Sequence, residues 1–150
     1  MVFGLGEVVE VCGLAGTGKS QICFQLCLNV QVPRAFGGVE GQALFIDTHG
    51  DFAAERVTEM AKSLRAQVLK NIDRDPTEHK KHRDEFSIDK ILSRIHFIRI
   101  LDECYQLLLK DKIEQVVQTL PNLKLIVMDT FCEHLRGSDH AFNERRRQIA

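Results

Sequence analysis

The sequence predicts one α/β domain in which a mostly parallel sheet is flanked by helices. Short apolar runs rich in β-branched residues alternate with segments of helical periodicity, the order expected of strand–helix–strand units. The runs are apolar at nearly every position, as in parallel strands that are covered on both faces. With 150 residues, 44% of them hydrophobic, the chain is long enough for one domain with a core and too short for two.

The expected elements follow one another in strand–helix order. The apolar runs predict strands at residues 8–12, 43–47, 95–100 and 123–129. Apolar side chains three or four positions apart predict helices within residues 22–30, 57–68 and 109–120.

A polar insert interrupts this alternation at about residues 70–86. It contains Pro76 and the run His79-Lys80-Lys81-His82-Arg83. Histidine is a common metal ligand, but no cysteine or second histidine pair follows at ligand spacing. We therefore expect a solvated loop or helix face here.

The charge balance argues against a stand-alone nucleic-acid binder. The formal net charge is -1, whereas such proteins usually carry a surplus of lysine and arginine. Any contact with DNA is therefore expected to be local, or to be supplied by partners.

Cysteine usage indicates a reducing compartment. The five cysteines are odd in number and include no Cys-x-x-Cys pair, which fits free thiols better than a secreted disulfide scaffold. The first residues lack the basic and apolar regions of a signal peptide, and no apolar run has the length of a membrane span. We expect a soluble intracellular protein with no membrane partner.

One motif carries chemistry, a glycine-rich loop of the form G-x-x-x-x-G-K-[ST]. Its members are Gly13, Leu14, Ala15, Gly16, Thr17, Gly18, Lys19 and Ser20. Glycines let backbone N–H groups wrap phosphates closely, and the following helix directs its N-terminus at the anion. We expect these residues and Gln21 to bind nucleotide, with Lys19 at the β- and γ-phosphates. The alternative, a glycine turn without a ligand, is disfavoured because the loop lies between an apolar run and a helical stripe.

Two further groups are expected to serve Mg²⁺ beside the phosphates. The Ser20 hydroxyl is one, and an acid at the end of another strand usually holds the metal through its water shell. Asp129 closes the apolar run Leu123–Asp129, at the strand end that faces the ligand in parallel sheets. Asp47 is the rival strand-end acid, and we predict Asp129.

Four segments narrow the choice among phosphate-loop proteins. The Asn-Lys-x-Asp motif of GTPases is absent, and small-molecule kinases usually have lid arginines and a different glycine loop. The segments are Glu10-Val11-Cys12-Gly13, Gly18-Lys19-Ser20-Gln21-Ile22-Cys23, Phe36-Gly37-Gly38-Val39-Glu40-Gly41 and Phe45-Ile46-Asp47-Thr48. Together they resemble the eukaryotic RecA-type recombinases over nearly the whole chain. Residues 86–95 and the polar insert look most like one group of paralogues, the Rad-fifty-one-C type.

This resemblance implies a RecA-like P-loop NTPase core with ATP and Mg²⁺ as cofactors. It implies a DNA-binding role in homologous recombination and the repair of DNA damage, within a hetero-oligomeric complex of recombinase paralogues. The DNA in that complex is expected to be single-stranded or branched. The expected location is the nucleus, with the cytoplasm as a second compartment.

Two arginines are carried over from the family pattern. Arg56 falls where the family has an arginine against the adenine, and a guanidinium plane can stack on a base. A surface helix arginine is the alternative. Arg136 falls in the first DNA-facing loop of the family and is a candidate phosphate contact, with a plain solvated loop as the alternative.

The chain departs from the family at the residue that positions the attacking water. The family reads Asp-Thr-Glu-Gly, and this chain reads Asp47-Thr48-His49-Gly50. A neutral imidazole can accept a proton, but it is shorter than glutamate and lacks the fixed negative charge. We interpret His49 as a lost catalytic base. Two functions stay open, an ATPase with weak hydrolysis and a nucleotide-dependent interaction module without significant ATPase activity.

The family pattern also implies that residues 1–150 form a C-terminally incomplete core. The family has further strands beyond this point, one of them between the strands expected at residues 8–12 and 123–129. We therefore expect the chain alone to be poorly stable, and to bind DNA weakly and in a salt-sensitive way.

Overall fold

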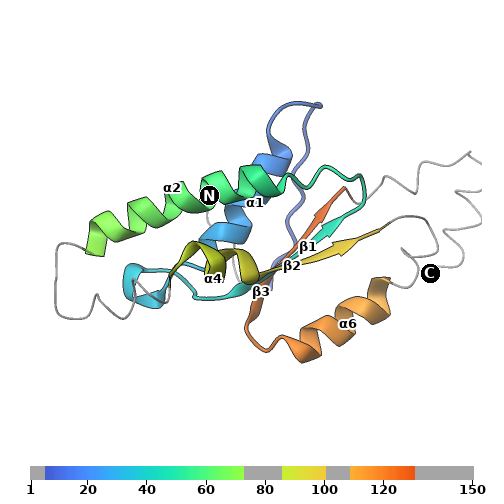
Figure 1. The fold of residues 1–150 in the computed structure, drawn as a ribbon. Helices are drawn as coiled ribbons and strands as arrows, with labels where there is room; N and C mark the ends of the chain where they lie inside the picture. The colour runs from blue at the N-terminus through green and yellow to red at the C-terminus, as the bar shows by residue number, and fades with distance from the viewer. Residues whose placement is uncertain (1–5, 73–85, 101–108, 131–150) are drawn as a thin grey trace, which may run out of the picture.

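The computed structural model describes three stretches of the chain, residues 6–72, 86–100 and 109–130. They form a parallel sheet with helices on both of its faces (Figure 1). None of the described helices is both long and apolar enough to cross a lipid bilayer. The helices are α1 (Lys19–Asn29), the 3₁₀ turn η1 (Arg34–Phe36), α2 (Ala54–Ile72), α4 (Ile88–Ser93) and α6 (Leu109–Thr119).

The described sheet has three strands in the order β2-β1-β3, and both pairings are parallel. Strand β1 (Gln42–Asp47) is central, between β2 (Ile95–Arg99) and β3 (Leu123–Asp129). These bounds agree within one residue with three of the predicted strands. Because parallel strands run in the same direction, their carboxyl ends meet at one edge of the sheet.

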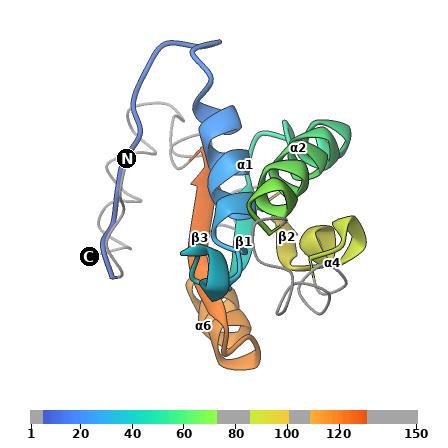
Figure 2. The same ribbon diagram turned by 90° about the vertical axis from the view of Figure 1, so that its left-hand side faces the viewer.

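Helices α1, α2 and α4 lie together on one side of the strands (Figure 2). Aromatic rings form the centre of this layer. The Phe45 ring of β1 lies 5.4 Å from that of Phe24 and 5.1 Å from that of Phe52, centroid to centroid. Phe97 of the edge strand β2 extends the cluster, 4.9 Å from Phe52. Such aromatic contacts add to the free energy gained from apolar burial.

Helix α6 packs on the opposite side of the sheet. Leu44 and Ile46 of β1 are buried there, and Ile113 and Val116 of α6 pack against their cluster. Successive side chains of a strand point to opposite faces. Two apolar layers therefore explain why the central strand is apolar at almost every position.

The prediction of a strand at residues 8–12 is wrong. The structure has no strand there, and Val8 is fully exposed. An extended segment becomes a strand only when its N–H and C=O groups find a ladder partner. The described sheet consists of β2, β1 and β3, so residues 8–12 have no ladder partner among the described residues.

Helix α4 was not expected, because six residues are too few to show a helical period. Its N-terminus is set by Ser87, whose side chain accepts a hydrogen bond from the Lys90 N–H at 3.4 Å. Ile91 anchors the helix in the core. The predicted polar insert begins within the last turn of α2, and its residues 73–85 lie outside the described residues.

We predict that Phe45→Ala lowers the free energy of unfolding by about 3–5 kcal/mol, because a buried ring leaves a cavity. Phe97→Ala is the matched control, since Phe97 belongs to the same aromatic cluster but is 47% exposed, against 1% for Phe45. The control should lose less than half as much unfolding free energy. Urea denaturation followed by circular dichroism measures both variants. Equal losses would contradict a buried aromatic layer centred on Phe45.

Candidate nucleotide-binding site

The glycine-rich loop owes its shape to two residues with left-handed backbone. Gly16 has φ 77° and Gly18 has φ 91°. A side chain built at either position would meet no atom within 4 Å, so space does not require glycine there. The backbone conformation does, because residues with a Cβ are strained at positive φ. The loop sequence therefore determines its curl directly.

Hydrogen bonds close the loop on itself. The Thr17 hydroxyl donates to the Leu14 carbonyl at 2.8 Å, and the Thr17 N–H donates to the same oxygen at 3.4 Å. The Lys19 ammonium donates to the carbonyls of Gly13, at 3.0 Å, and Leu14, at 2.9 Å. The lysine thus lies against the loop's own backbone, with its positive charge inside the curl.

Helix α1 begins directly after Gly18 with an uncapped N-terminus. No side chain caps its first turn, and the first turn contains no acidic residue. The first N–H groups of a helix have no partner within the helix, and the helix dipole adds partial positive charge there. Together with Lys19, this end of α1 has the donors and the charge that bind an anion.

Asp129 lies at the end of β3 and close to α1. Burial raises the pKa of the Cys23 thiol to about 11, and the negative charge of Asp129 adds to the rise. The carboxylate is therefore near Cys23, which lies one turn after Ser20 on the same side of α1. Helix α1 also packs against β3, the strand that Asp129 closes. No group of three or more His, Cys, Asp or Glu side chains forms a metal cluster in the part of the chain that the structure describes.

The carboxylate of Asp47, the other strand-end acid, is occupied by hydrogen bonds to nearby backbone N–H groups and to an arginine. Its Oδ1 accepts the N–H groups of His49 at 3.0 Å and Gly50 at 2.6 Å, and its Oδ2 accepts that of Phe52 at 3.3 Å. The Arg99 guanidinium donates to Oδ2 at 2.9 Å. Burial alone raises the pKa of this carboxyl, but the N–H groups and the Arg99 charge outweigh burial and lower it. Asp47 therefore organises the backbone that follows β1.

His49 lies on the turn that Asp47 organises. Its side chain is 52% exposed, and its Nε2 lies 3.8 Å from Asp51 Oδ2. Thr48, just before it, ties the turn to the end of β3. The Thr48 hydroxyl donates to the Thr130 carbonyl at 2.6 Å and accepts the Thr130 N–H at 2.9 Å. The turn with His49 is therefore joined to the strand that carries Asp129.

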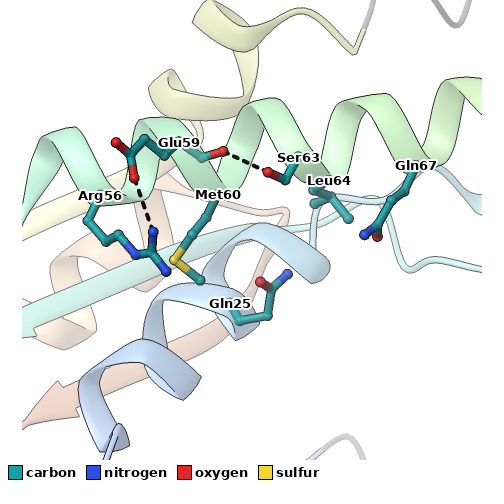
Figure 3. A pocket seen from close by; sticks show the side chains of 7 residues that line it. All are labelled: Gln25, Arg56, Glu59, Met60, Ser63, Leu64 and Gln67. Atoms are coloured by element: carbon teal, nitrogen blue, oxygen red, sulfur yellow. Dashed lines mark hydrogen bonds and ion pairs between the residues drawn. The ribbon is translucent and has the colours of Figure 1, made fainter. Parts of the chain in front are cut away.

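Arg56 joins α2 to the first turn of α1. Its Nε donates to Gln21 Oε1 at 3.0 Å, and its Nη1 pairs with Glu59 at 3.0 Å. The structure thus brings together Gln21 and Arg56, both expected at a nucleotide. Arg56 also borders a pocket of about 340 Å³ between α1 and α2 (Figure 3). The lining residues are Gln25, Arg56, Glu59, Met60, Ser63, Leu64 and Gln67.

A family model described as Rad51 matches residues 3–119 of the chain. The chain belongs to the Rad51 family. With the parallel sheet and its flanking helices, this match confirms the expected RecA-like α/β fold.

Two relatives show how far the similarity extends. The chain is 41% identical over 100 residues to "DNA repair protein RAD51 homolog 3" of Cricetulus griseus, which covers 65% of this chain and 27% of that protein. It is 34% identical over 130 residues to "DNA repair and recombination protein RadA" of Aeropyrum pernix, covering 87% of this chain and 34% of that protein. The chain thus spans about a third or less of these relatives' length.

The structure of this Rad51-family chain adds residues that sequence patterns did not single out. Arg99 was missed because it lies inside the apolar run of residues 95–100 and meets Asp47 only through strand register, 52 positions away. Thr48 and Thr130 were missed for the same reason, since their contact spans 82 positions. Arg136, the candidate DNA contact, lies outside the described residues.

We predict that Asp47→Asn costs about 1–3 kcal/mol of unfolding free energy at neutral pH, because it leaves buried donors without an acceptor. The pKa of Asp47 is lowered in the folded state, so the stabilising effect is present above the unfolded pKa of about 3.9 and is lost as pH falls through the folded value. The gap between parent and variant should therefore be constant above about pH 5 and narrow below about pH 4.

Denaturant unfolding at a series of pH values measures this gap. Asp111→Asn is the control, because Asp111 is exposed on α6, and it should differ little from the parent at any pH. A gap that is the same at acid and neutral pH would contradict the assignment.

Proposed function

We propose that this chain binds Mg²⁺–ATP at the loop of residues 13–20 and acts in homologous-recombination DNA repair with weak ATP hydrolysis. The observation that carries the proposal is the arrangement of the loop. Two left-handed glycines curl the backbone, the Lys19 ammonium lies within the curl, and α1 begins there without a cap. The lysine and the helix start supply positive charge, and the helix start supplies free N–H donors, at the point where the glycines curl the backbone. A chain of phosphates requires this combination.

Each expected nucleotide contact has a place in this arrangement. The backbone N–H groups of the loop and Lys19 would hold the phosphates, and Ser20 and Asp129 would serve Mg²⁺. A metal held by few protein ligands suits Mg²⁺, which keeps several waters and binds substrate phosphates. Gln21 and Arg56 stand together beside the loop, where Arg56 would lie against the base. Bound Mg²⁺ would neutralise charge on the phosphates.

His49 is the reason to expect weak hydrolysis. It replaces the family's glutamate on a turn that is attached to the strand of Asp129. A half-exposed imidazole lacks the fixed charge that orients an attacking water. This observation also supports the second function, a nucleotide-dependent interaction module in which ATP sets a conformation and turnover is incidental.

The biological role rests on the relatives. Similarity to a protein named RAD51 homolog 3 supports a recombinase paralogue, and with it the Rad-fifty-one-C type that the sequence resembles. Such a paralogue would work with other recombinase paralogues in a hetero-oligomeric complex. Single-stranded or branched DNA would be the substrate of that complex, in the nucleus and also the cytoplasm.

We predict that Lys19→Ala weakens Mg²⁺–ATP affinity at least tenfold, because charge-assisted contacts to phosphate are among the strong ones and about 1.4 kcal/mol corresponds to a factor of ten. Lys62→Ala is the matched control, since Lys62 is exposed on α2. Titration of a fluorescent ATP analogue measures both. Equal affinity of Lys19→Ala and the parent would show that the loop does not bind nucleotide as proposed.

We predict that His49→Glu raises single-turnover ATP hydrolysis, by about 10²–10⁴-fold if the carboxylate acts as a full general base. His96→Glu is a matched control on β2, where the His96 ring contacts Gln42. A parent that already hydrolyses ATP at ordinary rates would contradict the lost-base interpretation. A folded His49→Glu variant slower than the parent would contradict it as well.

A further inference from the structure

Three charged residues form a row across the carboxyl end of the sheet. Strand register pairs Arg99 of β2 with Asp47 of β1, and Asp47 with Asp129 of β3. Register partners in neighbouring strands point to the same face of a sheet. The row therefore runs Arg99, Asp47, Asp129, on the face where Phe45 meets α1.

Arg99 neutralises the middle member of this row. Its guanidinium lies 2.9 Å from Asp47 Oδ2, and the Asp47 side chain is only 3% exposed. A carboxylate this deeply buried is costly unless it is paired and hydrogen-bonded. Arg99 therefore neutralises the negative charge of Asp47. Among the described residues, Asp129 makes no ion pair, so its negative charge has no such partner.

The paired Asp47 carboxylate shapes the turn of residues 48–52. Its Oδ1 accepts two successive N–H groups, from His49 and Gly50. Its Oδ2 lies between the Phe52 N–H and Arg99. Arg99 thus fixes the orientation in which the carboxylate meets the backbone at His49 and just after it.

Arg99 also packs directly on this turn. Gly50 has φ 99°, and a Cβ at this position would overlap the guanidinium of Arg99. The backbone of Gly50 therefore lies against the flat guanidinium. The same arginine contacts the turn itself and the carboxylate around which the turn folds.

We propose that Arg99 is a positioning residue for ATP hydrolysis, acting through Asp47 to hold the turn that carries His49 beside the strand of Asp129. Arg99 does not touch the nucleotide in this arrangement; it sets where residue 49 stands. The proposal rests on the proposed nucleotide site, because the turn matters for turnover only if ATP binds at the loop.

The test replaces Arg99 by glutamine in the His49→Glu background, where turnover is measurable. We expect Mg²⁺–ATP affinity to change less than about twofold, since the loop is untouched, and the single-turnover rate to fall about 10–100-fold, since misplacement by about 1 Å can cost that much. Arg65→Gln is the matched control. Arg65 Nε donates to the Phe86 carbonyl at 2.9 Å, a structural contact remote from the turn, so its loss should leave both quantities unchanged.

An amide NMR spectrum of each variant without nucleotide separates the two claims. In the parent with its native His49, Arg99→Gln should shift the amide signals of His49, Gly50 and Phe52 and leave those of the loop in place. Arg65→Gln should leave the turn signals where they are. Unmoved turn signals in Arg99→Gln would overturn the positioning role even if ATP binds. Shifted turn signals without ATP binding would overturn the proposed function, and with it the role of Arg99 in hydrolysis, but would leave the structural link between Arg99 and the turn intact.

Arg99→Lys supplies a second variant that keeps the positive charge. Its single-turnover rate and its amide signals for the turn should lie closer to those of the parent than the values of Arg99→Gln do. If Arg99→Gln does not fold, the rate, affinity and amide signals of Arg99→Lys are compared with the parent instead. An affinity that falls in step with the rate in Arg99→Lys would overturn the proposal, because it would show that the arginine supports binding of the nucleotide.

Discussion

The parallel pairing of β1 with both of its neighbours is the constraint on which the site depends. It brings the last residues of three strands to one edge of the sheet, so that Asp47 has Arg99 on one side and Asp129 on the other. Past the strand ends, the Thr48–Thr130 contacts continue the link between β1 and β3. Residues far apart in the sequence are therefore held together by backbone pairing.

The two acids of this edge differ in chemistry because their surroundings differ. Asp47 is buried, paired with Arg99 and hydrogen-bonded to three N–H groups. Its negative charge therefore stabilises the turn of residues 48–52. Asp129 makes no ion pair within the described residues and lies near the first turns of α1. A carboxylate without an ion pair, at the end of a strand that packs against α1, suits a group that would bind Mg²⁺ beside phosphates. The row therefore contains one acid with a structural role, Asp47, and one suited to bind a metal ion, Asp129.

Local sequence predicted most of the fold and only part of the site. Strands β1, β2 and β3 and helices α1, α2 and α6 were predicted because their apolar periods are long and clear. Residues 8–12 have the same apolar character, yet a strand requires a pairing partner that no local pattern reports. The loop was predicted because glycine spacing encodes its left-handed turns. The Arg99–Asp47 and Arg56–Gln21 contacts, 52 and 35 positions apart, depend on register and helix packing and could not be predicted from spacing.

In the proposed function, the phosphate loop, the start of α1 and the end of β3 form one Mg²⁺–nucleotide site. Amide hydrogen exchange of the parent chain, with and without Mg²⁺–ATP, tests it most directly. We predict slower exchange in residues 13–22 with ATP, and slower exchange around Asp129 only when Mg²⁺ is present. Unchanged exchange in residues 13–22 at saturating Mg²⁺–ATP, or protection confined to the α1–α2 pocket, would contradict it.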